Sequence, residues 1–336
     1  MPWKGEKDPY KIWLSEIILQ QTRVEQGWNY YNNFINTFPS VHDLAKADEK
    51  KVFKLWEGLG YYSRCKNLII TAKKISGELK GKFPNTYDEI KNLKGIGPYT
   101  AAAISSFAFN EAQAVVDGNV QRVLSRYFGM DIPIDSTAGK KAYQIVAQEL
   151  LDKKQPGIYN QAIMDFGAVI CKPKNPLCSE CVQQHECVAL KKNLVKQLPV
   201  KSKSLVKKDR WFYYFIIQVN DKVYIRQRMA KDIWENLHEF VLFEPGGPLE
   251  AIDPNIPFLK KIIGKQPFGL TSVSPVFRQQ LSHQNIHGRF VTIDLKKPLH
   301  ALKDYWLVEK KNLPNYAFPR FINAFLTRPA TQPQLF

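Results

Sequence analysis

The sequence predicts two domains of different class, an all-helical domain followed by an α+β domain. A chain of 336 residues is too long for one ordinary core, and its 44% of hydrophobic residues is enough to fill two. Residues 8 to about 170 place apolar side chains at helical spacing, with few strand signals. After Lys191 short β-rich runs follow one another, so the helical domain should end close to that residue.

The first expected helix begins at Asp8-Pro9, where the aspartate can cap the helix and the proline suits its first turn. Ile12 and Leu19 fall on one side of this helix. The other side carries a larger apolar set, namely Tyr10, Trp13, Leu14, Ile17 and Ile18. The helix should therefore be buried, and Glu16 with it. A buried carboxyl must keep its proton or find a cation, so Glu16 is either an acid catalyst or half of an ion pair.

Two short helices joined by a Gly-x-Gly turn, at Gly95 and Gly97, form the next expected feature. Thr86 and Glu89 fit a capping box that starts the first helix, and Pro98 begins the second. Because glycine has no Cβ, the turn amides can approach a DNA phosphate closely. The pattern predicts a helix-hairpin-helix motif, although tight turns between helices also use glycine for its positive φ.

Asp117 follows two valines and precedes Gly118-Asn119 at the start of another helix, which should run through Arg126. An aspartate in this place is an ordinary helix cap. A carboxylate at a loop-to-helix junction can also face a cleft and stabilise a developing positive charge. The sequence alone leaves both interpretations open.

Four cysteines within seventeen residues form the strongest chemical signal: Cys171, Cys178, Cys181 and Cys187. Their gaps of six, two and five residues allow four thiolates to close around one 4Fe-4S cluster, which takes soft sulfur ligands from short loops. Zinc is the main alternative, although structural zinc sites usually pair two short knuckles across a longer spacer. Disulfides are disfavoured, because no signal peptide is expected and Cys65 would be left over.

Residues 196–210 are expected to form a basic linker, since they contain Leu198-Pro199 and a Lys/Ser-rich run over 201–208. The strands expected after the linker are 211–219, 223–227, 240–243, 289–295 and 305–308. Two short helices, near 258–263 and 318–326, complete the α+β domain.

The charge of the chain indicates a nucleic-acid partner. The formal net charge is +17 and the pI is near 9.5, as expected of a protein that binds phosphates. A generic solvated basic surface is the alternative. Because no run of eighteen or more apolar residues occurs, we expect no membrane span and a cytoplasmic protein.

The hairpin, the aspartate after it and the cysteine spacing together resemble the helix-hairpin-helix DNA glycosylases. Three further motifs are similar to those of the MutY-type adenine DNA glycosylases, which act at 8-oxoguanine:adenine mispairs: Trp13-Leu14-Ser15-Glu16-Ile17-Ile18-Leu19-Gln20-Gln21-Thr22, Gly58-Leu59-Gly60-Tyr61-Tyr62 and Val116-Asp117-Gly118-Asn119-Val120. The resemblance implies an all-helical glycosylase domain with a 4Fe-4S loop at 171–187. The later part resembles that family's Nudix-like module, without the metal box of Nudix hydrolases.

The resemblance also implies catalytic roles. In that family an acid protonates adenine at N7, and a second carboxylate stabilises the oxocarbenium-like sugar. Glu16 matches the acid and Asp117 matches the second carboxylate, with Tyr99 and Asn119 as hydrogen-bonding support. Tyr99 stands where the endonuclease III branch has a lysine that forms a Schiff base and nicks the strand. Removal of a flipped-out adenine, without strand cleavage, is therefore implied.

DNA-contacting residues follow from the same resemblance. Those assigned around 8-oxoguanine are Gln21, Thr22 and Tyr61, and Ser282 and His283 in the loop Leu281-Ser282-His283. Trp3 and Gln161 are assigned to the adenine pocket, and the hairpin glycines to a phosphate. A polar turn is the alternative for the loop. Family members usually carry a further segment before Trp3 and arginine in place of Lys4, so part of the pocket wall is expected to differ.

The expected organisation is a glycosylase domain at 1–195, the linker at 196–210, a lesion-recognition domain at 211–329 and a tail at 330–336. The expected partner of this monomer is double-stranded DNA with 8-oxoguanine:adenine or guanine:adenine mispairs, and the expected cofactor is a 4Fe-4S cluster. Two alternatives remain. One is an endonuclease III-like glycosylase and lyase, and the other is a cluster-bearing DNA-binding protein without turnover.

Overall fold

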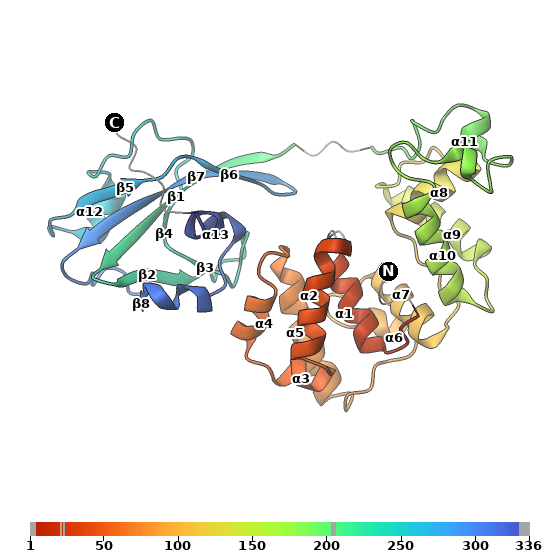
Figure 1. The fold of residues 1–336 in the computed structure, drawn as a ribbon, viewed down its shortest axis with the longest axis horizontal. Coiled ribbons are helices and arrows are strands. Elements are labelled where there is room, and N and C mark those ends of the chain that lie inside the picture. The colour runs from red at the N-terminus through yellow and green to blue at the C-terminus, as the bar shows by residue number, and fades with distance from the viewer. Residues whose placement is uncertain (1–4, 21, 23, 203–205, 329–336) are drawn as a thin grey trace. The chain divides into compact units, whose positions relative to one another are not determined.

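The structure, a computed structural model, describes residues 5–20, 22, 24–202 and 206–328 (Figure 1). The chain divides into two compact units. Unit 1 comprises residues 1–47 and 66–204, and unit 2 comprises residues 48–65 and 205–336. Unit 2 therefore includes a short segment from the helical half of the sequence as well as the β-rich half.

Unit 1 is helical over its described residues, which confirms the predicted all-helical class. Its elements are α1 (Pro9–Leu19), α2 (Val24–Thr37), α3 (Val41–Lys46), α5 (Tyr62–Gly77, which begins in unit 2), α6 (Tyr87–Lys91), α7 (Pro98–Phe109), α8 (Gly118–Phe128), α9 (Thr137–Leu150), α10 (Pro156–Val169), η1 (Cys178–Glu180) and α11 (Val188–Lys191). Within the described ranges, no helix is long and apolar enough to cross a membrane.

Helix α1 is buried, as its apolar residues on both sides predict. The side chain of Asp8 caps the helix by accepting the amide of Tyr10 at 2.9 Å. Trp13 and Leu14 are almost fully buried, at 1% and 0% exposure. Helix α1 packs against α7, whose small buried residues allow a close approach. The consequence is that Glu16, in the middle of α1, lies in the protein interior.

Buried apolar side chains hold the turn between α6 and α7 in place. Thr86 caps α6, as predicted, but α6 ends at Lys91, before the expected end at Gly95. The chain turns here because Leu93 and Ile96 both point into the core, at 4% and 6% exposure.

A mixed β-sheet forms unit 2, which confirms the predicted α+β class. The strands are β1 (Lys208–Val219), β2 (Lys222–Gln227), β3 (His238–Glu239), β4 (Val241–Phe243), β5 (Gly269–Val273), β6 (Phe277–Gln280), β7 (Gln284–Leu295) and β8 (Trp306–Glu309). The helical elements are α4 (Glu49–Leu55), α12 (Pro257–Ile263), η2 (Lys310–Asn315) and α13 (Arg320–Leu326). The main path of the sheet is β3-β2-β1-β7-β5, and among the described strand pairs only β1 and β7 run parallel.

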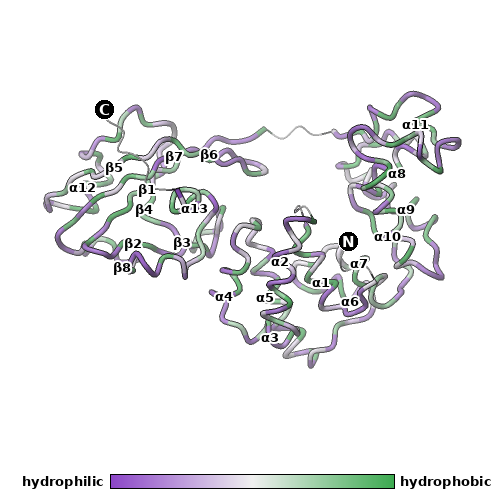
Figure 2. The backbone as a smooth tube through the Cα atoms, viewed as in Figure 1, coloured by the Kyte–Doolittle hydropathy of each residue, from purple (hydrophilic) through white to green (hydrophobic). Residues whose placement is uncertain are grey.

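The two faces of the sheet follow the strand period of two. Much of β1 is hydrophobic (Figure 2), because both of its faces are buried. One face packs against Leu259 and Ile263 of α12 and includes Tyr213, Phe215, Ile217, Val291 and Ile293. The other face packs against α13 through aromatic contacts of Phe321 with Tyr214 and Phe290.

Three features of the sheet differ from the sequence expectation. Strand β1 begins at Lys208, inside the range expected to be linker, because its first residues pair with β7 from Gln284 onward. Strands β5 and β6 were not expected, since their residues are largely exposed and show no clear alternation. Strand β7 begins at Gln284 and not at residue 289, the start expected from the sequence because Gly288 interrupts the hydrophobic pattern. A Cβ there would lie 1.8 Å from the carbonyl oxygen of Phe212, so glycine permits the close β1–β7 pairing.

Candidate functional site

The buried Glu16 of α1 pairs with the partly buried Tyr99 of α7. The Tyr99 hydroxyl donates a hydrogen bond to Glu16 Oε2 at 2.8 Å. Burial raises the pKa of Glu16 to about 7; the nearby charge of Asp117 also raises this pKa, and the hydrogen bond from Tyr99 opposes both. A large fraction of Glu16 therefore keeps its proton at neutral pH.

Asp117 caps α8 and also belongs to the site. Its Oδ1 accepts the amides of Asn119 and Val120 at 2.9 and 2.8 Å, and its Oδ2 accepts Asn119 Nδ2 at 2.7 Å. Burial raises the pKa of Asp117, while these hydrogen bonds lower it. The structure thus shows Asp117 as a helix cap whose charge also raises the pKa of Glu16.

Glu16 lines a small cavity. Its lining consists of Gly5, Glu6, Ile12, Ser15, Glu16, Phe107, Gln161 and Met164. Ile12, Phe107 and Met164 are apolar, while Glu16 and Gln161 supply hydrogen-bonding groups. This mixture suits a flat ring with a polar edge.

Arg122 supports Asp117 indirectly, through a hydrogen bond to Asn119. Its Nη2 donates to Asn119 Oδ1 at 2.9 Å and to the carbonyl oxygen of Gly167 at 2.6 Å, and its Nε donates to the carbonyl oxygen of Cys171 at 2.7 Å. A Cβ on Gly167 would lie 2.9 Å from the Asn119 carbonyl oxygen, so glycine in α10 permits close packing against α8. One run of hydrogen bonds thus joins Asp117, Asn119, Arg122 and the first cysteine of the loop.

The glycines of the hairpin lie at the surface. Gly95 has a φ of 78°, and a Cβ there would meet the Asn67 side chain at 2.5 Å. Gly97 is the N-cap of α7, and both glycines are exposed. Thr71 holds the turn by donating to the Lys94 carbonyl oxygen at 2.8 Å. The surface position suits a phosphate contact, whereas the φ of Gly95 shows that the turn also needs glycine for its conformation.

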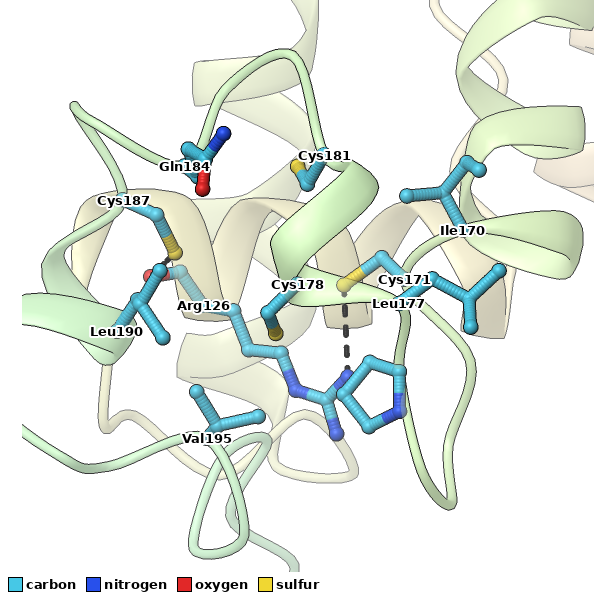
Figure 3. Close-up of a pocket in the computed structure, with 11 residues that line it drawn as sticks. Arg126, Ile170, Cys171, Leu177, Cys178, Cys181, Gln184, Cys187, Leu190 and Val195 are labelled. Atoms are coloured by element: carbon cyan, nitrogen blue, oxygen red, sulfur yellow. Dashed lines mark hydrogen bonds between the residues drawn. The ribbon is translucent and has the colours of Figure 1, made fainter.

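The four clustered cysteines border one cavity (Figure 3). All five cysteines of the chain lie in its described part and are free thiols. Arg126, only 4% exposed, donates from Nη1 to Cys171 Sγ at 3.4 Å and to the Lys172 carbonyl oxygen at 2.8 Å. Burial and then the charges of the three other cysteines raise the pKa of Cys178.

The donor set of this cavity fits an iron–sulfur cluster or another thiophilic cation. Four thiolates in one space repel one another, and a bound cationic centre offsets that repulsion. The Arg126 guanidinium adds a positive donor toward the sulfurs. The residues that would hold such a group are Cys171, Cys178, Cys181 and Cys187, which line the cavity together.

Tyr61 and Ser282 meet within unit 2. Their hydroxyl groups are hydrogen-bonded, although the two residues are far apart in sequence. Ser282 lies at the tip of the β6–β7 hairpin, and the neighbouring His283 is exposed. Tyr61 has a φ of 46° and remains 44% exposed. Two side chains assigned to one base are thus brought together.

The structure places the remaining assigned residues as follows. Thr22 lies three residues after the end of α1 and donates its amide to the Leu19 carbonyl oxygen at 3.0 Å. Gln161 lies on α10 and lines the cavity of Glu16. Trp3 and Gln21 lie outside the described residues, as does Lys4.

Arg122, Arg126 and Gly167 were missed by sequence reasoning. The two arginines are four residues apart on α8, which places both on one face of the helix. Their burial, at 8% and 4% exposure, was not anticipated. Two arginines at helical spacing before a four-cysteine loop are a signal that could have suggested a cation facing the thiolates.

Comparisons with known proteins agree with this fold. A model of the HhH-GPD superfamily of base excision DNA repair proteins matches residues 14–150, and a NUDIX domain model matches residues 213–328. The chain is therefore a helix-hairpin-helix base excision repair protein with a NUDIX-type domain. The adenine DNA glycosylase of Buchnera aphidicola from Schizaphis graminum is 37% identical over 73% of this chain and 70% of that protein. The chain belongs to the adenine DNA glycosylase family, hydrolases of N-glycosyl bonds that act in base excision repair.

Two further comparisons extend this result. The human adenine DNA glycosylase is 41% identical over 59% of this chain and 38% of that protein. A thermostable thymine-DNA glycosylase structure covers 57% of this chain and 88% of that chain, with a TM-score of 0.53 and 30% identity. An endonuclease III–DNA complex, at 20% identity and a TM-score of 0.50, shows the same fold. Because the chain belongs to the adenine DNA glycosylase family, DNA is the partner of this protein.

Proposed function

We propose that the protein hydrolyses the N-glycosidic bond of adenine paired with 8-oxoguanine or guanine in duplex DNA. The observation that carries the proposal is the buried Glu16, which borders a cavity and accepts a hydrogen bond from Tyr99, with its pKa raised to about 7. An adenine anion leaves poorly, so the reaction needs a proton donor. A carboxyl that keeps its proton near neutral pH supplies one.

In the proposed reaction, Glu16 and Gln161 act on the adenine base and Asp117 acts on the sugar. Glu16 donates its proton to N7 of an adenine flipped into the cavity, and the Gln161 amide hydrogen-bonds the edge of the base. The C1′–N9 bond breaks, its electron pair stays with adenine, and positive charge develops on the sugar. The Asp117 carboxylate, held by Asn119, stabilises that charge. Water adds to C1′ and releases its proton to one of the two carboxylates, which leaves an abasic site.

Tyr99 argues against the lyase alternative. A phenol cannot form the Schiff base with which a lysine would nick the strand. Borohydride trapping of the reaction should therefore yield no covalent enzyme–DNA product. A trapped product would favour the glycosylase and lyase alternative.

Recognition of 8-oxoguanine is assigned to unit 2. The hydrogen-bonded Tyr61 and Ser282, with His283 exposed beside them, place three polar groups where a few contacts can read a base edge. Thr22 and Gln21 are proposed to line the same base, and Trp3 the adenine. The surface turn of Gly95 and Gly97 is proposed to bind a phosphate.

The cofactor proposed for the cysteine loop is a 4Fe-4S cluster held by Cys171, Cys178, Cys181 and Cys187. It would supply a cationic crosslink that orders the loop and, through the Cys171 backbone, the partners of Arg122. Anaerobically purified protein should show absorbance near ~400 nm and about four irons. Stoichiometric zinc without colour would overturn this assignment.

A single-turnover assay tests the proposed acid. Glu16→Gln keeps the shape of the side chain but cannot donate the proton, so adenine release should slow by about 10²–10⁴-fold while mispair binding is retained. Glu78→Gln, at an exposed position just after α5, is the matched control and should leave the rate unchanged. Turnover of Glu16→Gln within tenfold of the unsubstituted protein would reject the assignment.

A further inference from the structure

Glu57 joins the segment 48–65 to the C-terminal part of unit 2. Its Oε1 accepts the amide of Phe318 at 2.8 Å and Nδ2 of Asn323 at 2.9 Å. Its Oε2 accepts Nζ of Lys54 at 2.6 Å, and the same ammonium donates to the Tyr316 carbonyl oxygen at 3.1 Å. One carboxylate therefore holds both the chain that leads into α13 and the helix itself.

The groups that Glu57 holds are themselves firmly placed. Phe318 is 1% exposed, and its ring stacks on Phe240 with centroids 5.6 Å apart. The Ala317 carbonyl oxygen accepts the amide of His238 at 2.8 Å. The Glu57 side chain is 17% exposed, and charge-assisted hydrogen bonds of this kind are stronger than neutral ones. The contact therefore links α13 and the chain before it to the segment 48–65.

Helix α13 in turn packs against the β6–β7 hairpin, which carries Ser282 (Figure 1). Phe325 stacks on Phe290 of β7 with centroids 4.2 Å apart. Phe321 and Phe325 also pack edge-on against Phe277 of β6, at 6.3 and 6.1 Å. Strands β6 and β7 form the hairpin, so its base rests on α13.

The tip of the β6–β7 hairpin contacts the segment 48–65, which also contains Glu57. Trp56 Nε1 donates to the Gly60 carbonyl oxygen at 3.0 Å, and the Gly58 amide donates to the Tyr62 hydroxyl at 3.2 Å. These bonds shape a tight loop that presents Tyr61 to Ser282. A single short segment thus holds the base of the hairpin through Glu57 and its tip through Tyr61.

We propose that Glu57 is a positioning residue for lesion discrimination. It acts through α13 and the aromatic layer to hold Ser282 against Tyr61, and it has no contact with DNA in this role. The inference rests on the proposed reading of 8-oxoguanine by Ser282. It predicts that the preference for 8-oxoguanine:adenine over guanine:adenine depends on the Glu57 carboxylate, while cleavage chemistry does not.

The test compares single-turnover rates on the two duplexes at subsaturating enzyme. Glu57→Ala removes the acceptor of Phe318, Asn323 and Lys54, and it should lower the ratio of the 8-oxoguanine:adenine rate to the guanine:adenine rate about tenfold. Glu57→Gln keeps an oxygen acceptor for Phe318 and Asn323, so it should restore the ratio to within about threefold. Glu250→Ala, an exposed glutamate of the same unit, is the control and should change neither rate.

Epistasis separates this role from a general effect on folding. If Glu57 acts through Ser282, Glu57→Ala combined with Ser282→Ala should lose no more discrimination than Ser282→Ala alone. Asn323→Ala, which removes one partner of the carboxylate, should reproduce part of the loss even if Glu57→Ala does not fold. Additive losses, or equal slowing on both duplexes, would overturn the inference. Absence of any preference in the unsubstituted protein would instead reject the proposed function.

Discussion

The Tyr99 hydroxyl should set the upper pH limit of adenine release. It donates the hydrogen bond that opposes the effect of burial on Glu16. Tyr99→Phe removes that bond and leaves the burial and the charge of Asp117 in place. A hydrogen bond to a charged group contributes about 1.5–3 kcal/mol, and 1.36 kcal/mol corresponds to one pKa unit. The pKa of Glu16 should therefore rise further, by about 1 to 2.

The measurement is the single-turnover rate of adenine release as a function of pH. Glu16 must hold its proton to act, so the rate of the unsubstituted protein should fall as pH rises through about 7. In Tyr99→Phe the fall should move to higher pH, even if the maximal rate is lower. Tyr127→Phe is the control, because within the described residues the Tyr127 hydroxyl bonds neither carboxylate.

Stability should change with pH for the same reason. The folded-state pKa of Glu16 lies above its ordinary value of 4.5, so between about 4.5 and 7 the native state binds a proton that the unfolded chain has lost. This contribution to the free energy of unfolding therefore decreases as pH rises through that window.

For the rate measurement, a pH limit of adenine release that stays in place or moves down in Tyr99→Phe would refute the reasoning. Tyr99 would then be a packing residue.

Three other outcomes are expected. Gly167→Ala should lower the melting temperature and slow adenine release, because the added methyl would collide with the backbone of Asn119; an unchanged rate with an unchanged Tm would show that α10 relaxes freely. Arg126→Met should reduce the iron content and the absorbance near ~400 nm of purified protein, whereas full iron loading would mean that the guanidinium is not needed. Ser282→Ala with His283→Ala should reduce discrimination by about 1–3 kcal/mol and leave the salt dependence of binding unchanged, and a lower salt slope would identify the loop as a phosphate clamp.

Local signals in the sequence determined much of the fold and part of the site. Asp8 and Thr86 cap the helices that their positions predict, since a cap depends on neighbours two or three residues away. Gly95 has the positive φ that a tight turn between helices demands. The spacing of the cysteines likewise defines the set of four thiols that border one cavity. These features are short-range, so neighbouring residues suffice to specify them.

Contacts between distant residues were decided only by the tertiary structure. The sequence marked Glu16 as buried, but the pairing with Tyr99 across 83 positions depends on how α1 packs against α7. The place of Arg122 between Asn119 and the Cys171 backbone depends on α10 approaching α8. Segment 48–65, although helical in sequence pattern, joins unit 2 because Glu57 finds its partners more than 260 residues later. Burial and partner choice at such positions depend on the whole packed chain, and no local pattern encodes them.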